Sequence, residues 1–212
     1  MAKTTRSERV IEDIKVRILD EALKLLREEG YENLSMYKLG KRTNMTAANL
    51  YNYYKNKNQL LIAIHKRTFE LLYNMLLESV ANEKDPIEKL RKIMTTFVGF
   101  GKEFPNFYDL MFNRSVPQVS DYAGTPEEAM SRDEYQSSIR NLYLVSDIGK
   151  EIVSGHPELE GIDRDFYFLK MFGELHGLLS LYNSGILKVI VENPDQAIER
   201  VIDDLFAPYL RK

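Results

Sequence analysis

The stretch from Thr46 to Lys57, with the sequence TAANLYNYYKNK, decides the fold of this chain. The Thr46 hydroxyl can cap a helix, because it can accept a backbone N–H of the first turn. Leu50 is an inward-facing apolar residue, so its neighbours must face outward. The stretch therefore predicts a short capped helix that carries Tyr51 and Tyr53 and ends just before Lys57.

A second short helix is predicted directly upstream, from its cap at Ser35 to Thr43. The turn that joins the two helices contains Asn44, and asparagine tolerates the left-handed conformation better than most residues. A helix, a three-residue turn and a second helix form the geometry that places the second helix in the major groove of DNA. On the bracing helix, the residues expected to face inward are Met36, Leu39 and Gly40.

Apolar residues recur at helical spacing along nearly the whole chain, and no segment alternates for long between apolar and polar residues. A first helix carries one such stripe and ends at Gly30, which we expect to be a left-handed cap. We therefore expect an all-α protein: an N-terminal three-helix bundle with a helix-turn-helix, followed by a C-terminal antiparallel helical domain. The stripe of the first helix is Val10, Ile14, Ile18, Leu19, Ala22, Leu25 and Leu26.

Later helices are predicted from capping side chains followed three residues on by an acid or amide. Three of these starts also have proline at the first helical position, where a missing N–H costs nothing. We expect a loop over residues 113–124. The expected helices span residues 57–82, 86–102, 105–112, 126–154, 163–183 and 194–208.

Charge is distributed unevenly along the chain. Residues 1–57 contain 12 Lys and Arg against 8 Asp and Glu, a net of +4, whereas the whole chain has a net charge of −3. A basic end on an acidic body favours one region that binds a polyanion, although ordinary scatter also produces an excess of this size. We expect a helix-turn-helix DNA-binding domain over residues 1–57 and a second domain over 58–212.

The outward side of the predicted helix suits double-stranded DNA. Alanine allows close approach to base edges, and an asparagine amide can pair with adenine. Tyrosine hydroxyls and Lys57 can hydrogen-bond phosphates, which position a helix without reading sequence. The alternative is that Tyr51, Tyr53 and Tyr54 are partly buried aromatics at a helix end, and Tyr54 lies nearest the face of Leu50.

Residues 16–64 resemble the DNA-binding domain of the TetR family of transcriptional regulators. The resemblance rests on Ile-Leu-x-x-Ala at residues 18–22, Glu-Gly-Tyr at 29–31 with the following Ser35, and Leu-Tyr-x-Tyr-Tyr-x-x-Lys at 50–57. This chain has Asn44 and Ala48 at two positions where the family commonly has glycine, and Ala48 affects how closely the backbone meets DNA. The resemblance implies base-side contacts by Tyr37, Thr46, Ala47, Tyr51 and Asn52, and phosphate contacts by Tyr53 and Lys57.

The same resemblance implies that residues 58–212 are an effector-binding and dimerisation domain, which forms a homodimer and holds a small effector. Residues 104–112 and 174–181 look like one branch of the family with a Trp-His-Gly signature, although Leu175 stands where that branch has tryptophan. We expect dimer contacts from the last two long helices, where Gly173 and Gly177 either allow a close crossing or make an internal core contact. Candidate effector-binding residues are Phe97, Tyr108, Met111, Phe112, Arg140, Tyr143, Glu174 and His176.

Other function classes find little support. The chain has no cysteine, no glycine-rich phosphate loop, and three histidines without metal-ligand spacing, so we expect no enzyme, no metal and no cofactor. The first ten residues lack the apolar core of a signal peptide, and no apolar run is long enough to span a membrane.

We expect a cytoplasmic regulator that binds a double-stranded DNA operator and acts as a repressor released by a small-molecule effector. The alternative is a helical protein-interaction module without specific DNA binding.

Overall fold

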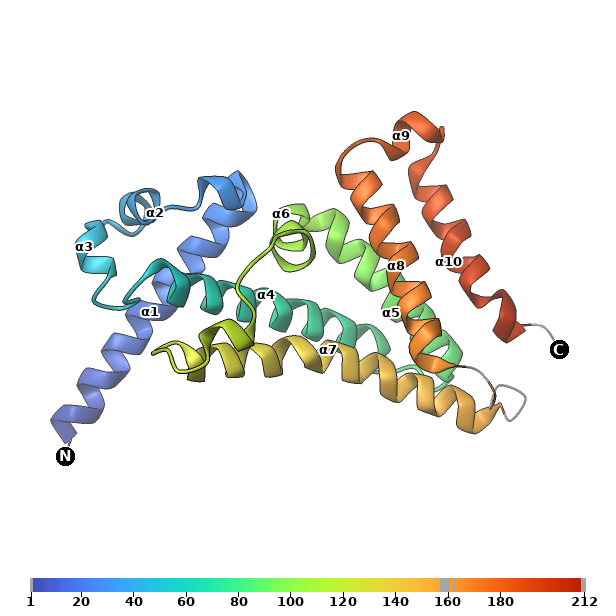
Figure 1. Ribbon diagram of the computed structural model, residues 1–212, viewed down its shortest axis with the longest axis horizontal. Coiled ribbons are helices and arrows are strands. Elements are labelled where there is room, and N and C mark those ends of the chain that lie inside the picture. The colour runs from blue at the N-terminus through green and yellow to red at the C-terminus, as the bar shows by residue number, and fades with distance from the viewer. Residues whose placement is uncertain (1, 157–160, 162, 211–212) are drawn as a thin grey trace. The chain divides into compact units, whose positions relative to one another are not determined.

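The chain is all-helical over the residues that the computed structural model describes, which are 2–156, 161 and 163–210 (Figure 1). No strand occurs among them. The α-helices are α1 (Ala2–Glu29), α2 (Met36–Thr43), α3 (Ala47–Leu50), α4 (Lys57–Val80), α5 (Pro86–Glu103), α6 (Pro105–Tyr108), α7 (Glu128–Gly155), α8 (Arg164–Asn183), α9 (Leu187–Ile190) and α10 (Pro194–Leu210). Two 3-10 turns, η1 (Tyr31–Asn33) and η3 (Val119–Tyr122), and a π-helical turn, η2 (Asp109–Asn113), complete the list.

The chain divides into two compact units. Unit 1 contains the residues up to Glu70 together with Asn106–Ser138. Unit 2 contains Leu71–Pro105 and the residues from Ile139 onward. The domain boundary expected between residues 57 and 58 was a boundary between functions. It does not coincide with the division into compact units, and it stays a prediction.

Capping side chains of the kind expected from the sequence are found at the starts of α2, α4, α5 and α10, whereas α7 begins at Glu128, two residues after the expected start at residue 126. Ser35 accepts the Lys38 N–H at 3.3 Å, and Asp85 accepts the Ile87 N–H at 2.8 Å. Asn56 and Asn193 accept in the same way at the starts of α4 and α10, at 2.9 and 3.1 Å. A polar side chain satisfies backbone donors that the first helical turn leaves unpaired, which is why each helix begins at these residues.

Unit 1 is built around the stripe of α1. Ile18, Ala22, Leu25 and Leu26 are fully buried, and α2 packs against this side of α1. The chain leaves α1 at Gly30, whose φ of 78° is positive, as expected for glycine at a helix end, but whose ψ of 174° differs from the left-handed helical cap that was predicted. The buried residues that close the unit's core from α2, α3 and α4 include Leu34, Leu39, Leu50, Leu60 and Ile64.

A set of polar contacts joins α4 to the start of α7 within unit 1. The buried Glu127 carboxylate accepts hydrogen bonds from the side-chain amides of Asn56 at 2.9 Å and Gln59 at 3.1 Å. The Asn56 hydrogen bond is the largest of the effects that lower the pKa of Glu127. The segment that follows α3 is thus hydrogen-bonded to a residue 71 positions later in the sequence. No local sequence pattern predicts a contact over this separation.

Unit 2 packs α5, α8 and α10 on one another. In Figure 1, α8 and α10 lie side by side and run in opposite directions, joined by the short α9. Among the α10 residues whose side chains the structure describes, the buried ones are Ile198, Ile202, Leu205 and Phe206. None of the described helices combines the length and the hydropathy that crossing a membrane requires.

Gly40 is required by the packing of α2 on the turn that follows it. A Cβ built at Gly40 would lie 2.6 Å from the Met45 carbonyl oxygen, a backbone atom that cannot move freely. In contrast, a Cβ at Gly99 in α5 meets nothing within 4 Å.

We expect Gly40→Ala to lower the free energy of unfolding by about 1–3 kcal/mol, because the turn must shift to admit the methyl group. The matched change Gly99→Ala should raise it by about 0.5–1 kcal/mol, since alanine favours a helix over glycine. Urea denaturation measures both values. Equal shifts in the same direction would contradict the assignment of Gly40.

Candidate nucleic-acid interface

The turn between α2 and α3 sets the direction in which α3 leaves α2. Asn44 has φ 56° and ψ 40°, the left-handed conformation expected for it. The Met45 N–H donates to the Gly40 carbonyl oxygen at 2.8 Å and closes the turn. The side chain of Met45 is half-buried, and that of Leu50 is fully buried, so both turn and helix are fixed to the core below them.

The helix α3 is shorter than the sequence predicted. It is regular only over Ala47–Leu50, and Tyr51, Asn52 and Tyr53 lie in the turns that follow. The N–H groups of Asn52 and Tyr53 donate to carbonyl oxygens three residues back, at 3.1 and 3.0 Å, which tightens the chain beyond an α-helix.

We call residues 46–53 the recognition segment. Thr46 accepts the Asn49 N–H at 3.1 Å, so its predicted cap is confirmed. The Asn52 side-chain amide donates to the Asn49 side-chain oxygen at 3.2 Å, which orients Asn52 and leaves its own oxygen free to accept.

Most residues proposed to touch DNA are accessible. Tyr37 is 67% exposed and Tyr51 is 41% exposed, values that rule out a core role for either ring. Ala47 and Tyr53 are half-buried. The exposed members of the set are Tyr37, Thr46, Ala48, Tyr51, Asn52 and Lys57.

Tyr54 differs from its neighbours, as its place beside Leu50 predicted. It is 5% exposed, and its hydroxyl donates to the Lys15 carbonyl oxygen of α1 at 3.3 Å. Burial, with smaller contributions from Glu12 and Asp20, raises the pKa of Tyr54 to about 12. Tyr54 therefore holds the recognition segment against α1, and its exposed neighbours do not.

The basic side chains of α2 fall into two groups. Lys38 pairs with Glu29 at 2.7 Å, and Arg42 pairs with Glu28 at 2.5 Å and Glu29 at 3.2 Å. These hydrogen bonds lower the pKa of both carboxyls, so the acids remain charged and bind their partners to α1. Lys41 has no carboxylate partner among the described residues, and the sequence analysis did not select it.

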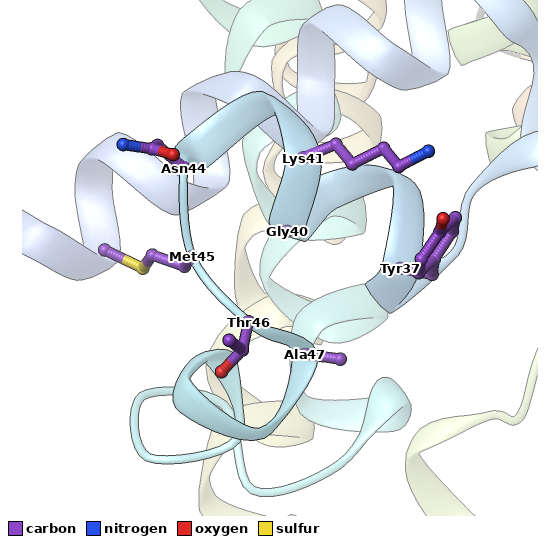
Figure 2. A pocket seen from close by; sticks show the side chains of 7 residues that line it. All are labelled: Tyr37, Gly40, Lys41, Asn44, Met45, Thr46 and Ala47. Carbon is purple, nitrogen blue, oxygen red and sulfur yellow. The ribbon is translucent and has the colours of Figure 1, made fainter.

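A depression of about 550 Å³ lies between α2 and the recognition segment. Figure 2 shows that the side chains of Tyr37, Lys41 and Ala47 extend to one side, whereas Asn44 and Met45 point to the other. The Lys41 Nζ lies 4.5 Å from the centroid of the Tyr37 ring. An aromatic ring, an ammonium group and a small methyl therefore share one accessible side of the motif.

The predicted effector-binding residues are divided between the two units. Tyr108, Met111 and Phe112 belong to unit 1, and Tyr108 and Met111 are buried. The rings of Tyr108 and Phe112 touch, with centroids 4.9 Å apart. The residues that belong to unit 2 are Phe97, Arg140, Tyr143, Glu174 and His176.

In unit 2, Phe97 is buried against Phe172 at 5.9 Å, and Phe172 stacks on His176 at 5.8 Å. Arg140 lies over the Tyr73 ring at 4.2 Å, and Tyr143 is 56% exposed. Glu174 lies 3.8 Å from the Lys170 Nζ. The structure thus brings Phe97 and His176 into contact with the same ring, that of Phe172, whereas the roles of all eight residues stay predictions.

A buried polar group that the sequence analysis passed over lies in unit 1. His65 Nδ1 is 2.8 Å from a Glu134 oxygen, and His65 Nε2 is buried without a hydrogen-bond partner among the described residues. His65 lines a cavity of about 20 Å³ together with Leu110 and Tyr122. Its ring touches Phe69 at 5.1 Å, and Phe69 touches Phe112 at 5.8 Å.

No group of three side chains able to hold a metal ion occurs within the part of the chain that the structure describes.

Residues 18–64 match the family described as bacterial regulatory proteins, tetR family. The chain is 30% identical over 110 residues to a protein of Haemophilus influenzae described as an uncharacterized HTH-type transcriptional regulator, covering 51% of this chain and 59% of that one. The chain spans about half the length of the curated relatives that it matches. The family match ends before His176, so membership of the Trp-His-Gly branch stays a prediction.

The fold also matches solved structures. A TetR-like transcriptional regulator from Rhodococcus sp. RHA1 has a TM-score of 0.60 at 17% identity, over 92% of this chain and 94% of that one. The fatty acid degradation regulator FadR from Bacillus halodurans has a TM-score of 0.64 at 16% identity, over 90% of this chain and 96% of that one. These similarities show the expected all-α fold.

The buried hydroxyl of Tyr54 makes stability sensitive to alkaline pH. Its pKa rises from 10.0 to about 12 on folding, so the stability it adds is complete below about pH 10 and is lost as pH rises toward 12.

We expect Tyr54→Phe to be less stable than the unmodified chain by about 1 kcal/mol near pH 8, since the hydrogen bond to Lys15 is lost. The difference should shrink and change sign between about pH 10 and pH 12. Urea denaturation across this pH range measures it. A difference that does not vary with pH would exclude a buried Tyr54 hydroxyl.

Proposed function

We propose that this chain, whose residues 18–64 match the tetR family of bacterial regulatory proteins, is a member of that family, binds double-stranded DNA as a transcriptional regulator and is not an enzyme. The observation that carries the proposal is the recognition segment, which is held from below by Leu50 and Tyr54 while Tyr51 and Asn52 stay exposed. A regulator of this kind acts where the chromosome is, so we place it in the cytoplasm.

The proposed DNA contacts fall into two chemical classes, those to phosphates and those to base edges. Tyr51, Tyr53 and Lys57 supply hydroxyl and ammonium donors that fit phosphate oxygens, which position the protein on the duplex. For Tyr51, which the resemblance places on the base side, we therefore propose a phosphate contact instead. Ala47, Ala48 and Asn52 lie on the same segment and suit base edges, because methyl groups approach thymine and an amide pairs with adenine. Tyr37 and Thr46 complete the proposed base-side contacts.

We propose that the protein works as a homodimer through α8. Phe166, Leu169, Gly173, Gly177 and Ser180 recur at spacings of three and four, so they line one side of this helix. Phe166 and Leu169 are 63% and 64% exposed, and a Cβ built at either glycine meets nothing within 4 Å. An open, apolar and small-residue stripe supports a contact with a second copy, and a two-fold operator requires two such readers.

We also propose a repressor that a small effector releases. The effector must bind a conformation in which the spacing of the two recognition segments does not fit the operator, and must bind it more tightly than it binds the DNA-bound conformation. A coupling free energy of about 1.4 kcal/mol between effector and DNA lowers the operator affinity tenfold. Support comes from the apolar rings around Phe97 and Phe112 and from His65 on α4, the helix that begins just after the recognition segment. Titrating aromatic and acyl compounds against the protein–DNA complex tests this proposal.

We expect two substitutions in the recognition segment to act differently on DNA. Tyr51→Phe removes a phosphate donor and should weaken binding to the operator and to random DNA alike. Asn52→Ala should cost about 1–3 kcal/mol on the operator, confined to one base position. Fluorescence anisotropy with DNA from upstream of its own gene, and with a scrambled duplex, measures both effects.

Tyr135→Phe provides the control, because Tyr135 is an exposed tyrosine of α7 outside the proposed contacts. Equal behaviour of the Tyr51 and Asn52 variants on both duplexes would refute the assigned roles. If the unmodified chain binds neither duplex, the alternative of a helical protein-interaction module is the better account.

We expect Leu169→Glu to convert a dimer into a monomer, because it places a charge in the centre of the proposed α8 contact. Val189→Glu is the matched control, since Val189 is an apolar residue of α9 that is 84% exposed. Analytical ultracentrifugation at micromolar concentration measures both. A monomeric unmodified chain, with and without DNA, would remove the dimer from the proposal.

A further inference from the structure

We propose that Lys41, held over the Tyr37 ring, forms an additional phosphate-binding site for the DNA backbone on α2. This inference rests on the proposed DNA-binding function and adds a contact that the sequence analysis did not select. The ligand class is a phosphodiester, which an ammonium group binds through charge-assisted hydrogen bonds.

The first argument is the distribution of charge on α2. Of its three basic side chains, Lys38 and Arg42 are paired with Glu29 and Glu28 at the end of α1. Each of these pairs cancels its own charge, and a phosphate would have to compete with a carboxylate. Lys41 is the basic residue of α2 that has no such partner among the described residues, so its full charge is available.

The second argument is the way in which the ammonium is held. The Lys41 Nζ lies 4.5 Å from the centroid of the Tyr37 ring, four residues earlier on the same face of α2. A cation over an exposed ring gains a modest free energy. Fixing a lysine side chain otherwise costs conformational entropy. The ring therefore lowers the cost of ordering Lys41 without neutralising its charge, as a carboxylate would.

The third argument is position. Lys41 and Tyr37 line the depression beside Thr46 and Ala47, at the start of the recognition segment, and Figure 2 shows both side chains extending to the side on which Ala47 lies. A duplex that meets the recognition segment on this side also meets Lys41. Lys57 shows the same arrangement, since its Nζ lies 5.4 Å from the centroid of the Tyr31 ring.

The test is the salt dependence of DNA binding by the full-length protein. The probe is a fluorescent duplex of about 30 base pairs taken from the DNA upstream of its own gene. Each phosphate contact contributes about 0.9 to the slope of log affinity against log salt. We expect Lys41→Gln to lower the slope by about 0.9 for each protomer bound, and to weaken binding about three- to tenfold for each protomer at about 0.1 M salt.

Two control variants separate a contact from a general loss of charge. Lys84→Gln makes the same charge change in unit 2 and should leave the slope unaltered. The double variant Lys38→Gln with Glu29→Gln removes an ion pair of α2 without changing net charge. It should leave the slope within about 0.3 of the unmodified value, because a neutral pair releases no counterion.

A double-mutant cycle tests the part played by the ring. Tyr37→Leu removes the ring and should weaken binding more than Tyr37→Phe, which retains it. The extra loss should disappear when Lys41 is already glutamine, because the ring then has no cation to hold.

An unaltered slope in Lys41→Gln, or a ring effect that persists without Lys41, would overturn the inference while leaving DNA binding established. An unmodified chain without salt-dependent affinity for the duplex would overturn the proposed function itself.

Discussion

The hydrogen bond from the Met45 N–H to the Gly40 carbonyl oxygen is the constraint on which the recognition segment depends. It closes a turn that needs a left-handed residue at Asn44 and no Cβ at Gly40. With these conditions met, α3 leaves α2 in one direction, and Leu50 enters the core. The exposed side of the segment follows from that geometry. Because Leu50 is buried in the core, the residues on the opposite side of the segment face the solvent.

The stability of this region comes from contacts distant in sequence. Tyr54 donates to Lys15 of α1, and Glu127 binds the amides that open α4. The Asn106 side chain donates to the Arg27 carbonyl oxygen at 2.9 Å, and Arg114 pairs with both Glu32 and Asp109. Residues 106–138 therefore belong to the same compact unit as the helix-turn-helix.

The same residues show why sequence reasoning succeeds for some features and fails for others. The helix caps could be predicted from the sequence because a capping side chain and the backbone N–H that it accepts lie within one helical turn of each other. The length of α3 was not predicted, since the shift to bonds three residues back at Asn52 and Tyr53 depends on packing Tyr54 against α1. His65 was passed over because a lone histidine in a helix gives no sign that Glu134 lies beside it.

The sequence by itself determined an all-helical chain and the capped starts of α2, α4, α5 and α10, and it predicted the segment that suits DNA. Local hydrogen bonding and helical periodicity decide these features, and both act within a few residues. Only the tertiary structure decided which charges remain available. Lys38, Lys41 and Arg42 look alike in the sequence, but the end of α1 brings carboxylates to Lys38 and Arg42 and leaves Lys41 over the Tyr37 ring. Pairing of opposite charges follows distance in space, which a linear pattern does not contain.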